Sequence, residues 1–183
     1  MKKILLLILI LTPFSMFAQQ MNIMTFNIRF NNPGDGVNAW PNRVEMVSGL
    51  LKYHEPDIFG FQEALIGQIE DIQNTMPDYE WFGVGRDDGK KGGEFSPVFF
   101  NKKKFILIES GTFWLSETPE KPSKSWDAAL PRIVTWGKFK SKVTGKQFKY
   151  FNTHFDHKGD EARKNSAFVI RDKIKEISGN QGL

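Results

Sequence analysis

Residues 150–157 carry the strongest candidate for chemistry in the sequence. They read Tyr-Phe-Asn-Thr-His-Phe-Asp-His and place two histidines and an aspartate directly after an apolar run. Side chains of these types can bind a metal, contact a phosphate or transfer a proton. If the strand continued, His154 and Asp156 would share one face and His157 would point elsewhere. A polar surface turn has the same composition, so this segment alone leaves both interpretations open.

A carboxylate ends a second apolar run. Residues 56–63 read Pro-Asp-Ile-Phe-Gly-Phe-Gln-Glu, with a turn signal at the start and two polar residues at the end. An apolar interior does not hold Gln62 and Glu63 without partners, so we expect both at the C-terminal end of a buried strand, facing a cleft. Sites in α/β proteins lie at this end of the strands. The alternative is a solvated strand end in which Glu63 has no role.

Hydrophobic periodicity predicts the elements that position these residues. A strand at 22–30, a helix at 40–53 and the strand at 56–63 follow one another, which favours a parallel β-α-β unit. Further helices are expected at 64–76 and 161–177.

The middle of the chain has the pattern of short strands. We expect them at residues 79–84, 96–101, 105–112, 133–140 and 147–153. Turns at 102–104 and 144–146 predict hairpins. The long irregular loop at 116–130 separates two strands, and loops of this length are often functional.

The N-terminus indicates export. Residues 1–18 have the pattern of a secretory signal peptide: Lys2 and Lys3, an apolar run at 4–11, and the small residue Ala18 before a predicted cleavage at Gln19. The apolar run is too short to span a bilayer, and the chain has no cysteine for a disulfide or a lipid. We therefore expect a periplasmic or extracellular protein without a stable membrane anchor, whose residues 19–183 form one domain.

The net charge leaves nucleic acid as a possible partner but does not indicate it. Without Lys2 and Lys3 the chain has 23 basic and 21 acidic residues. A net charge of +2 is too small to indicate nucleic-acid binding, and it argues against an enzyme that acts on duplex DNA.

Three segments taken together resemble the endonuclease/exonuclease/phosphatase superfamily, which has the DNase I-like fold. They are residues 25–29 (Thr-Phe-Asn-Ile-Arg), 57–63 and 152–156, and their order and spacing match from about residue 22 onward. The resemblance implies an α/β fold: a four-layer sandwich of two β-sheets flanked by helices. It also implies a metal-dependent phosphoesterase. Glu63 would then be a Mg²⁺ ligand, Asn27 would orient the metal or phosphate, and His154 would stabilise the phosphoryl oxygens in the transition state.

The chemistry of phosphoester hydrolysis suits such residues. It requires a hard cation on oxygen ligands, so Mg²⁺ is the expected cofactor and Mn²⁺ the alternative. Glu94 stands where related proteins often carry another active-site acid, although an exposed turn would also hold a glutamate. Arg132 and Asp156 are candidates for binding the substrate, because a guanidinium binds phosphate oxygens bidentately. Trp126 is alone in the irregular loop and is the tryptophan that we expect to meet substrate.

The family pattern is incomplete in this sequence. The Gly-Asp-x-Asn strand and the Ser-Asp-His-like ending are absent, and the only histidines are His54, His154 and His157. We therefore expect a domain truncated at its C-terminus, catalytically incomplete as given and marginally stable alone. The alternative is a noncatalytic exported binding module with the same fold. The sequence predicts a phosphate-ester ligand, but neither the particular substrate nor the oligomeric state.

Overall fold

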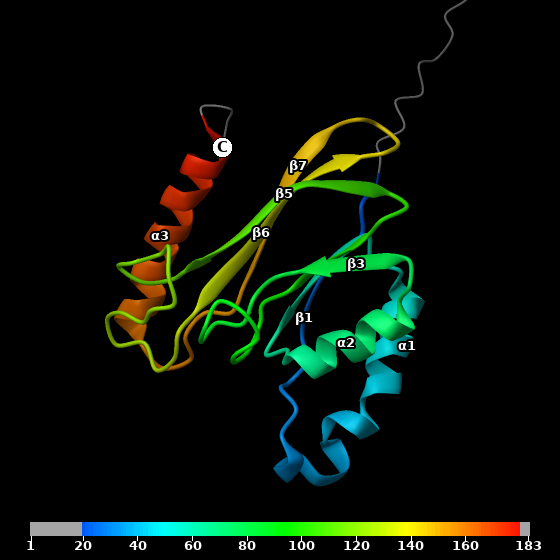
Figure 1. Ribbon diagram of the computed structural model, residues 1–183, viewed down its shortest axis with the longest axis horizontal. Helices are drawn as coiled ribbons and strands as arrows, with labels where there is room; N and C mark the ends of the chain where they lie inside the picture. Colours follow the sequence, from blue (N-terminus) through cyan, green and yellow to red (C-terminus); the bar gives the residue numbers. More distant parts are fainter. Residues whose placement is uncertain (1–19, 180–183) are drawn as a thin grey trace, which may run out of the picture.

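Two β-sheets pack face to face, with helices on their outer sides (Figure 1). The computed structural model describes residues 20–179, so the predicted signal peptide at 1–18 lies outside the described residues. The four-stranded sheet has the order β1-β2-β4-β3, and the three-stranded sheet has the order β5-β6-β7. This arrangement confirms the predicted α/β sandwich. Within residues 20–179, no helix has the length and apolar character needed to cross a bilayer.

The elements follow the predicted order, with boundaries that differ by a few residues. The strands are β1 Ile23–Asn27, β2 Ile58–Gln62, β3 Tyr79–Phe82, β4 Val98–Asn101, β5 Phe105–Trp114, β6 Ile133–Ser141 and β7 Gln147–Thr153. The α-helices are α1 Val44–His54, α2 Ile66–Thr75 and α3 Asp160–Ser178, and two 3₁₀ helices, η1 Pro33–Asn38 and η2 Trp40–Asn42, precede α1.

The first sheet contains the parallel pair that the β-α-β pattern predicts. β1 and β2 run parallel, with Asn27 opposite Gln62 at their C-terminal ends. Every residue of β2 is buried, because α1 and α2 lie on one face of this sheet and the second sheet lies on the other (Figure 1). Phe59 stacks on Phe99 of β4 with ring centroids 4.8 Å apart. This aromatic packing fixes β2, and Glu63 is the first residue after that strand.

One of the two predicted hairpins is wrong. The turn at 144–146 does join the antiparallel strands β6 and β7, and Gly145 supplies its positive φ of 71°. The turn at 102–104 instead carries the chain from β4 in the first sheet to β5 in the second. Short strands around a polar turn look the same in a sequence whether they pair with each other or separate into two sheets.

A buried asparagine joins the two sheets. The Asn152 side chain donates to the carbonyl oxygens of Phe61 at 2.7 Å and Pro97 at 3.0 Å, and it accepts from Gln62 Nε2 at 2.7 Å. A Cβ on Gly60 would lie 2.3 Å from this amide, so only glycine leaves room for it. The polar contact therefore fixes how β7 sits over β2.

The long loop before β6 is anchored to the last helix. Asp127 accepts hydrogen bonds from the backbone N–H groups of Glu161 and Ala162, in the first turn of α3, at 3.3 and 2.7 Å. These are two of the N–H groups that have no partner inside a helix, and the carboxylate also interacts favourably with the helix dipole. These two hydrogen bonds hold the loop against the N-terminus of α3.

Asn152→Ala should lower the free energy of unfolding by about 3 kcal/mol, because it removes three buried hydrogen bonds, two to carbonyl oxygens and one from the Gln62 side chain. Urea denaturation of the purified protein measures this. Asn74→Ala, at an exposed position on α2, is the matched control and should change stability by less than about 0.5 kcal/mol. An Asn152 variant within that range of the wild type would contradict the role assigned to the amide.

Candidate active site

Asn27 and Glu63 form a pair at the C-terminal ends of β1 and β2. Asn27 Nδ2 donates to Glu63 Oε1 at 2.8 Å, and the Asn27 Oδ1 atom accepts from the backbone N–H of Arg29 at 2.9 Å. Glu63 is half-buried and has a left-handed backbone conformation with φ of 61°. The pairing of parallel strands thus brings together two predicted site residues that are 36 positions apart.

Two further polar side chains hold the backbone next to Asn27 and Glu63 in place. Gln68 is fully buried; its Oε1 accepts from the N–H groups of Asn31 and Leu65, and its Nε2 donates to the Arg29 carbonyl oxygen. Arg43 donates to the carbonyl oxygens of Ile28 and Arg29 at 2.6 and 3.2 Å. These contacts fix the two loops that follow β1 and β2. We did not predict either residue, although a glutamine on the apolar face of a helix is a sequence signal for such a role.

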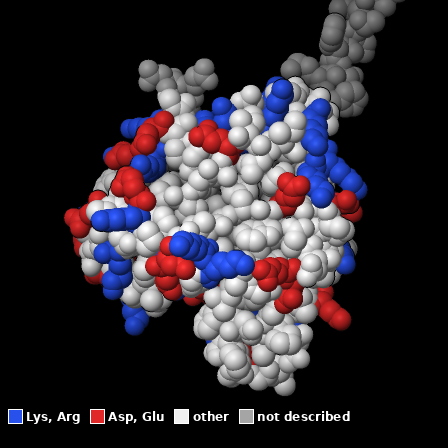
Figure 2. Space-filling view, viewed as in Figure 1, with Lys and Arg blue, Asp and Glu red and all other residues white. Residues whose placement is uncertain are grey.

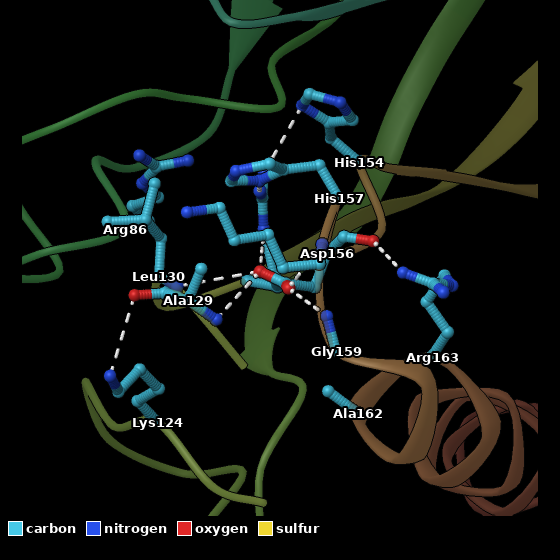
Figure 3. Close-up of polar contacts among 12 residues, drawn as sticks. Arg86, Lys124, Ala129, Leu130, His154, Asp156, His157, Gly159, Ala162 and Arg163 are labelled. Atoms are coloured by element: carbon cyan, nitrogen blue, oxygen red, sulfur yellow. Dashed lines mark hydrogen bonds and ion pairs between the residues drawn. The ribbon is translucent and has the colours of Figure 1, made fainter. Parts of the chain in front are cut away.

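The Arg132 side chain contacts three residues that follow β7. Its Nε donates to Asp156 Oδ1 at 3.2 Å, while Nη1 lies 3.3 Å from His154 Nδ1 and Nη2 lies 3.0 Å from His157 Nδ1 (Figure 3). The prediction that His157 would point away from His154 and Asp156 is therefore wrong. It assumed a continuing strand, but β7 ends at Thr153 and the chain then turns.

The Asp156 carboxylate is buried and surrounded by donors. It accepts from the N–H groups of Ala129, Leu130, Lys158 and Gly159 as well as from Arg132. Burial by itself would raise the pKa of Asp156, but these hydrogen bonds outweigh it and hold the pKa below its ordinary value. With its oxygens so engaged, Asp156 holds the loop and Arg132 in place; its predicted contact with substrate stays a prediction.

Glu94 lies beside His154 and Arg132 in a narrow cleft, together with an arginine that the sequence analysis did not single out. Arg86 donates to both Glu94 oxygens, at 2.8 and 3.1 Å, and both side chains line the cleft. The Nε of Arg86 is buried and, among the described residues, has no hydrogen-bond partner. A single arginine between Gly85 and Asp87 gave only a weak sequence signal, because its importance depends on how the loop folds.

Four predicted site residues do not line this cleft: Asn27, Glu63, Asp156 and Trp126. Trp126 is half-buried in the loop before β6 and has a left-handed backbone with φ of 55°. Its predicted contact with substrate stays a prediction.

The charges around His154 come from both sheets. Burial lowers the pKa of His154, and the positive charge of Arg132 lowers it further, whereas the Glu63 carboxylate raises it. Arg86 and His157 also lower this pKa. The lowered pKa favours the neutral imidazole form of His154, which lies within electrostatic reach of Glu63.

The oxygen atoms at Glu63 and Asn27 suit a hard cation. Mg²⁺ is commonly held by one or two carboxylates, with water and substrate phosphate completing its shell. The half-buried Glu63 carboxylate fits that pattern, and the Asn27 Nδ2 donor orients it. Within residues 20–179 no group of three or more His, Asp or Glu side chains is arranged to hold a metal ion, so these residues would supply only part of its ligands.

Comparison with known proteins relates this chain to phosphoesterases. The solved structure of an endonuclease/exonuclease/phosphatase protein from Bacteroides vulgatus is 50% identical, with a TM-score of 0.85 over 87% of this chain and 61% of that one. A mannosyl-6-phosphatase from Bacteroides thetaiotaomicron is 44% identical, with a TM-score of 0.87 over 90% of this chain and 62% of that one. The chain thus spans about three fifths of the length of these structures.

The other comparisons add little on function. An uncharacterized protein of Acanthamoeba polyphaga mimivirus is 29% identical over 153 residues, which cover 79% of this chain and 57% of that protein. No family model matches the chain.

Replacing Asp156 by asparagine should lower the unfolding free energy at pH 7 by about 3 kcal/mol, since it removes a charge held by several donors. Because the folded-state pKa of Asp156 is lowered, its stabilising effect is present above its unfolded pKa of about 4 and is lost as the pH falls below that value. The difference between wild type and variant should therefore shrink on acidification. Urea denaturation between pH 7 and pH 3 measures it.

Asp78→Asn is the control for this measurement, because Asp78 pairs with Lys103 at the exposed surface. Its effect should stay below about 1 kcal/mol at every pH. A stability difference for Asp156→Asn that did not change between pH 7 and pH 3 would contradict the lowered pKa.

Proposed function

Because the chain belongs to the endonuclease/exonuclease/phosphatase superfamily, whose DNase I-like fold it shares, we propose that it acts in the metal-dependent hydrolysis of a phosphate ester outside the cytoplasm. One observation carries the proposal: the ends of β1, β2 and β7 bring the Asn27–Glu63 pair and His154 to the same end of the two sheets. Phosphoester hydrolysis needs a cation site and a donor to phosphoryl oxygens, and these residues would supply both.

Each residue has a defined part in this proposal. Glu63 would hold Mg²⁺, and Asn27 would fix the orientation of the Glu63 carboxylate through its 2.8 Å hydrogen bond. When bound, Mg²⁺ neutralises charge on the phosphoryl oxygens and activates water. His154 would donate to a phosphoryl oxygen, and Arg86, beside it in the cleft, would add positive charge. Glu94 would hold Arg86 through both guanidinium nitrogens that it contacts.

A phosphate monoester is the substrate class that we propose first. The support is the 44% identity to a protein described as a mannosyl-6-phosphatase. Nucleic acid has less support, since acidic and basic side chains alternate over the face shown in Figure 2 instead of forming one broad basic surface.

Glu63→Gln should weaken Mn²⁺ binding, followed by electron paramagnetic resonance, by about tenfold or more, because it removes the charge of the proposed ligand. Glu70→Gln, on the exposed side of α2, keeps the same chemical change away from the site and should bind Mn²⁺ as the wild type does. Equal binding by all three proteins would contradict the metal site.

Hydrolysis is tested on the same proteins with mannose 6-phosphate and a bis-nitrophenyl phosphodiester, with and without Mg²⁺. Because the Gly-Asp-x-Asn and Ser-Asp-His-like segments are absent from this sequence, we expect at most slow Mg²⁺-dependent release of phosphate from the monoester, abolished by Glu63→Gln. Full activity would contradict the expected catalytic incompleteness. Metal and phosphate binding without turnover of either ester would favour the noncatalytic binding module.

Export is a separate part of the proposal, supported by the pattern of residues 1–18. Expressed in a bacterial host, the protein should appear outside the cytoplasm with Gln19 as its first residue, as read by N-terminal sequencing. Leu7→Arg should block this by interrupting the apolar run, whereas Leu7→Ile should not. Full-length protein retained in the cytoplasm would contradict export.

A further inference from the structure

Arg132 contacts two histidines and an aspartate with three different nitrogens. Nε contacts Asp156, Nη1 contacts His154 and Nη2 contacts His157, so each nitrogen of the planar guanidinium has its own partner. The side chain is 5% exposed, and Asp156 is held in turn by four backbone N–H groups. The Asp156 carboxylate, whose orientation is set by these backbone hydrogen bonds, therefore fixes the position and plane of the guanidinium.

The chemistry of a guanidinium decides the state of both histidine rings. Arginine stays protonated at all ordinary pH values and has only N–H donors. Each ring nitrogen that lies within hydrogen-bond distance of it, at 3.3 Å in His154 and 3.0 Å in His157, must therefore be an acceptor. A neutral imidazole with an unprotonated Nδ1 carries its proton on Nε2.

We propose that Arg132 is a positioning residue that fixes His154 and His157 as neutral rings protonated at Nε2. Both rings then present an N–H donor on the side away from Arg132. This inference goes beyond the predicted phosphate clamp, because each of the three guanidinium nitrogens already has a partner within the protein. Its connection to catalysis rests on the proposed function: the two Nε2–H groups would be donors to a phosphate oxygen anion.

The surroundings of His154 are consistent with a neutral ring. Burial disfavours its protonated form and so lowers its pKa, as do Arg132, Arg86 and His157, whereas Glu63 favours the protonated form. These groups come from the loops before β4 and β6, from the turn after β7 and from the end of β2. Neutral donors suit a site that already contains two guanidinium groups, because a further cation there would be repelled.

Histidine ring nitrogens report their protonation directly in nuclear magnetic resonance. In the protein labelled with ¹⁵N-histidine, at pH 7.5 and without ligand, His154 and His157 should each show a protonated Nε2 and an unprotonated Nδ1. The third histidine, His54, is exposed at the end of α1 and is the internal reference. A protonated Nδ1 at either His154 or His157 in the wild type would overturn the proposal.

Arg132→Lys keeps a positive charge but replaces the planar fork with one ammonium group, which cannot contact Asp156 and both rings in the same plane. We expect His154 and His157 to become mixtures of the two neutral tautomers, while the His54 signals stay unchanged. Rings that kept a single Nε2–H tautomer in this variant would show that Arg132 does not set it. If Arg132→Lys does not fold, the wild-type spectrum still decides the proposal.

Inorganic phosphate then separates this inference from the proposed function. Titrating it into the wild type should shift the Nε2 signals of His154 and His157 but not those of His54, and Arg132→Lys should weaken the apparent affinity by about tenfold. Correct tautomers without any response to phosphate would confirm the positioning by Arg132 and overturn the phosphate-binding function assigned to His154.

Discussion

The buried amide of Asn152 is the contact on which the geometry of the candidate site depends. It connects β7 to the backbone beside β2 and β4 and to the Gln62 side chain, in a space that exists only because Gly60 has no Cβ. Glu63 follows Gln62 directly and His154 lies two residues after Asn152. The same polar contact that fixes the spacing of the two sheets therefore fixes the distance between a carboxylate on one sheet and an imidazole on the other.

The site combines two arginine–carboxylate pairs with different roles. In the Arg86–Glu94 pair both carboxylate oxygens are used, which holds the guanidinium at the wall of the cleft. In the Arg132–Asp156 pair only Nε contacts the carboxylate, and the other nitrogens face the two histidines. Burying a charge is costly unless it is paired and hydrogen-bonded, and both pairs meet that condition. The positive charge is thus kept close to His154 without an isolated ion in the interior.

The sequence predicted local structure and the ends of strands better than side-chain partners. Hydrophobic periodicity gave every α-helix and strand of the described residues, since burial of one face is a local property of the pattern. It did not give the 3₁₀ helix η1. It could not show that the turn at 102–104 separates two sheets, because pairing depends on contacts between distant strands. Glu63 and Asn27 were found as strand-end polar residues. Arg86 and Gln68 were missed, and the position of His157 was predicted wrongly, since their partners are set by loops whose course no periodic pattern encodes.

Backbone strain at Glu63 and Arg29 explains why several hydrogen bonds hold the backbone beside the candidate metal ligand. Glu63 and Arg29 both have left-handed backbone conformations, with φ of 61° and 58°, which cost energy in residues with a side chain. Gln68 and Arg43 offset that cost, because they donate to the Arg29 carbonyl oxygen from two directions. The left-handed turn directs the Glu63 carboxylate toward Asn27 instead of into the core below β2. The orientation of a proposed metal ligand is therefore determined by hydrogen bonds to backbone atoms, made by residues that do not contact the metal site themselves.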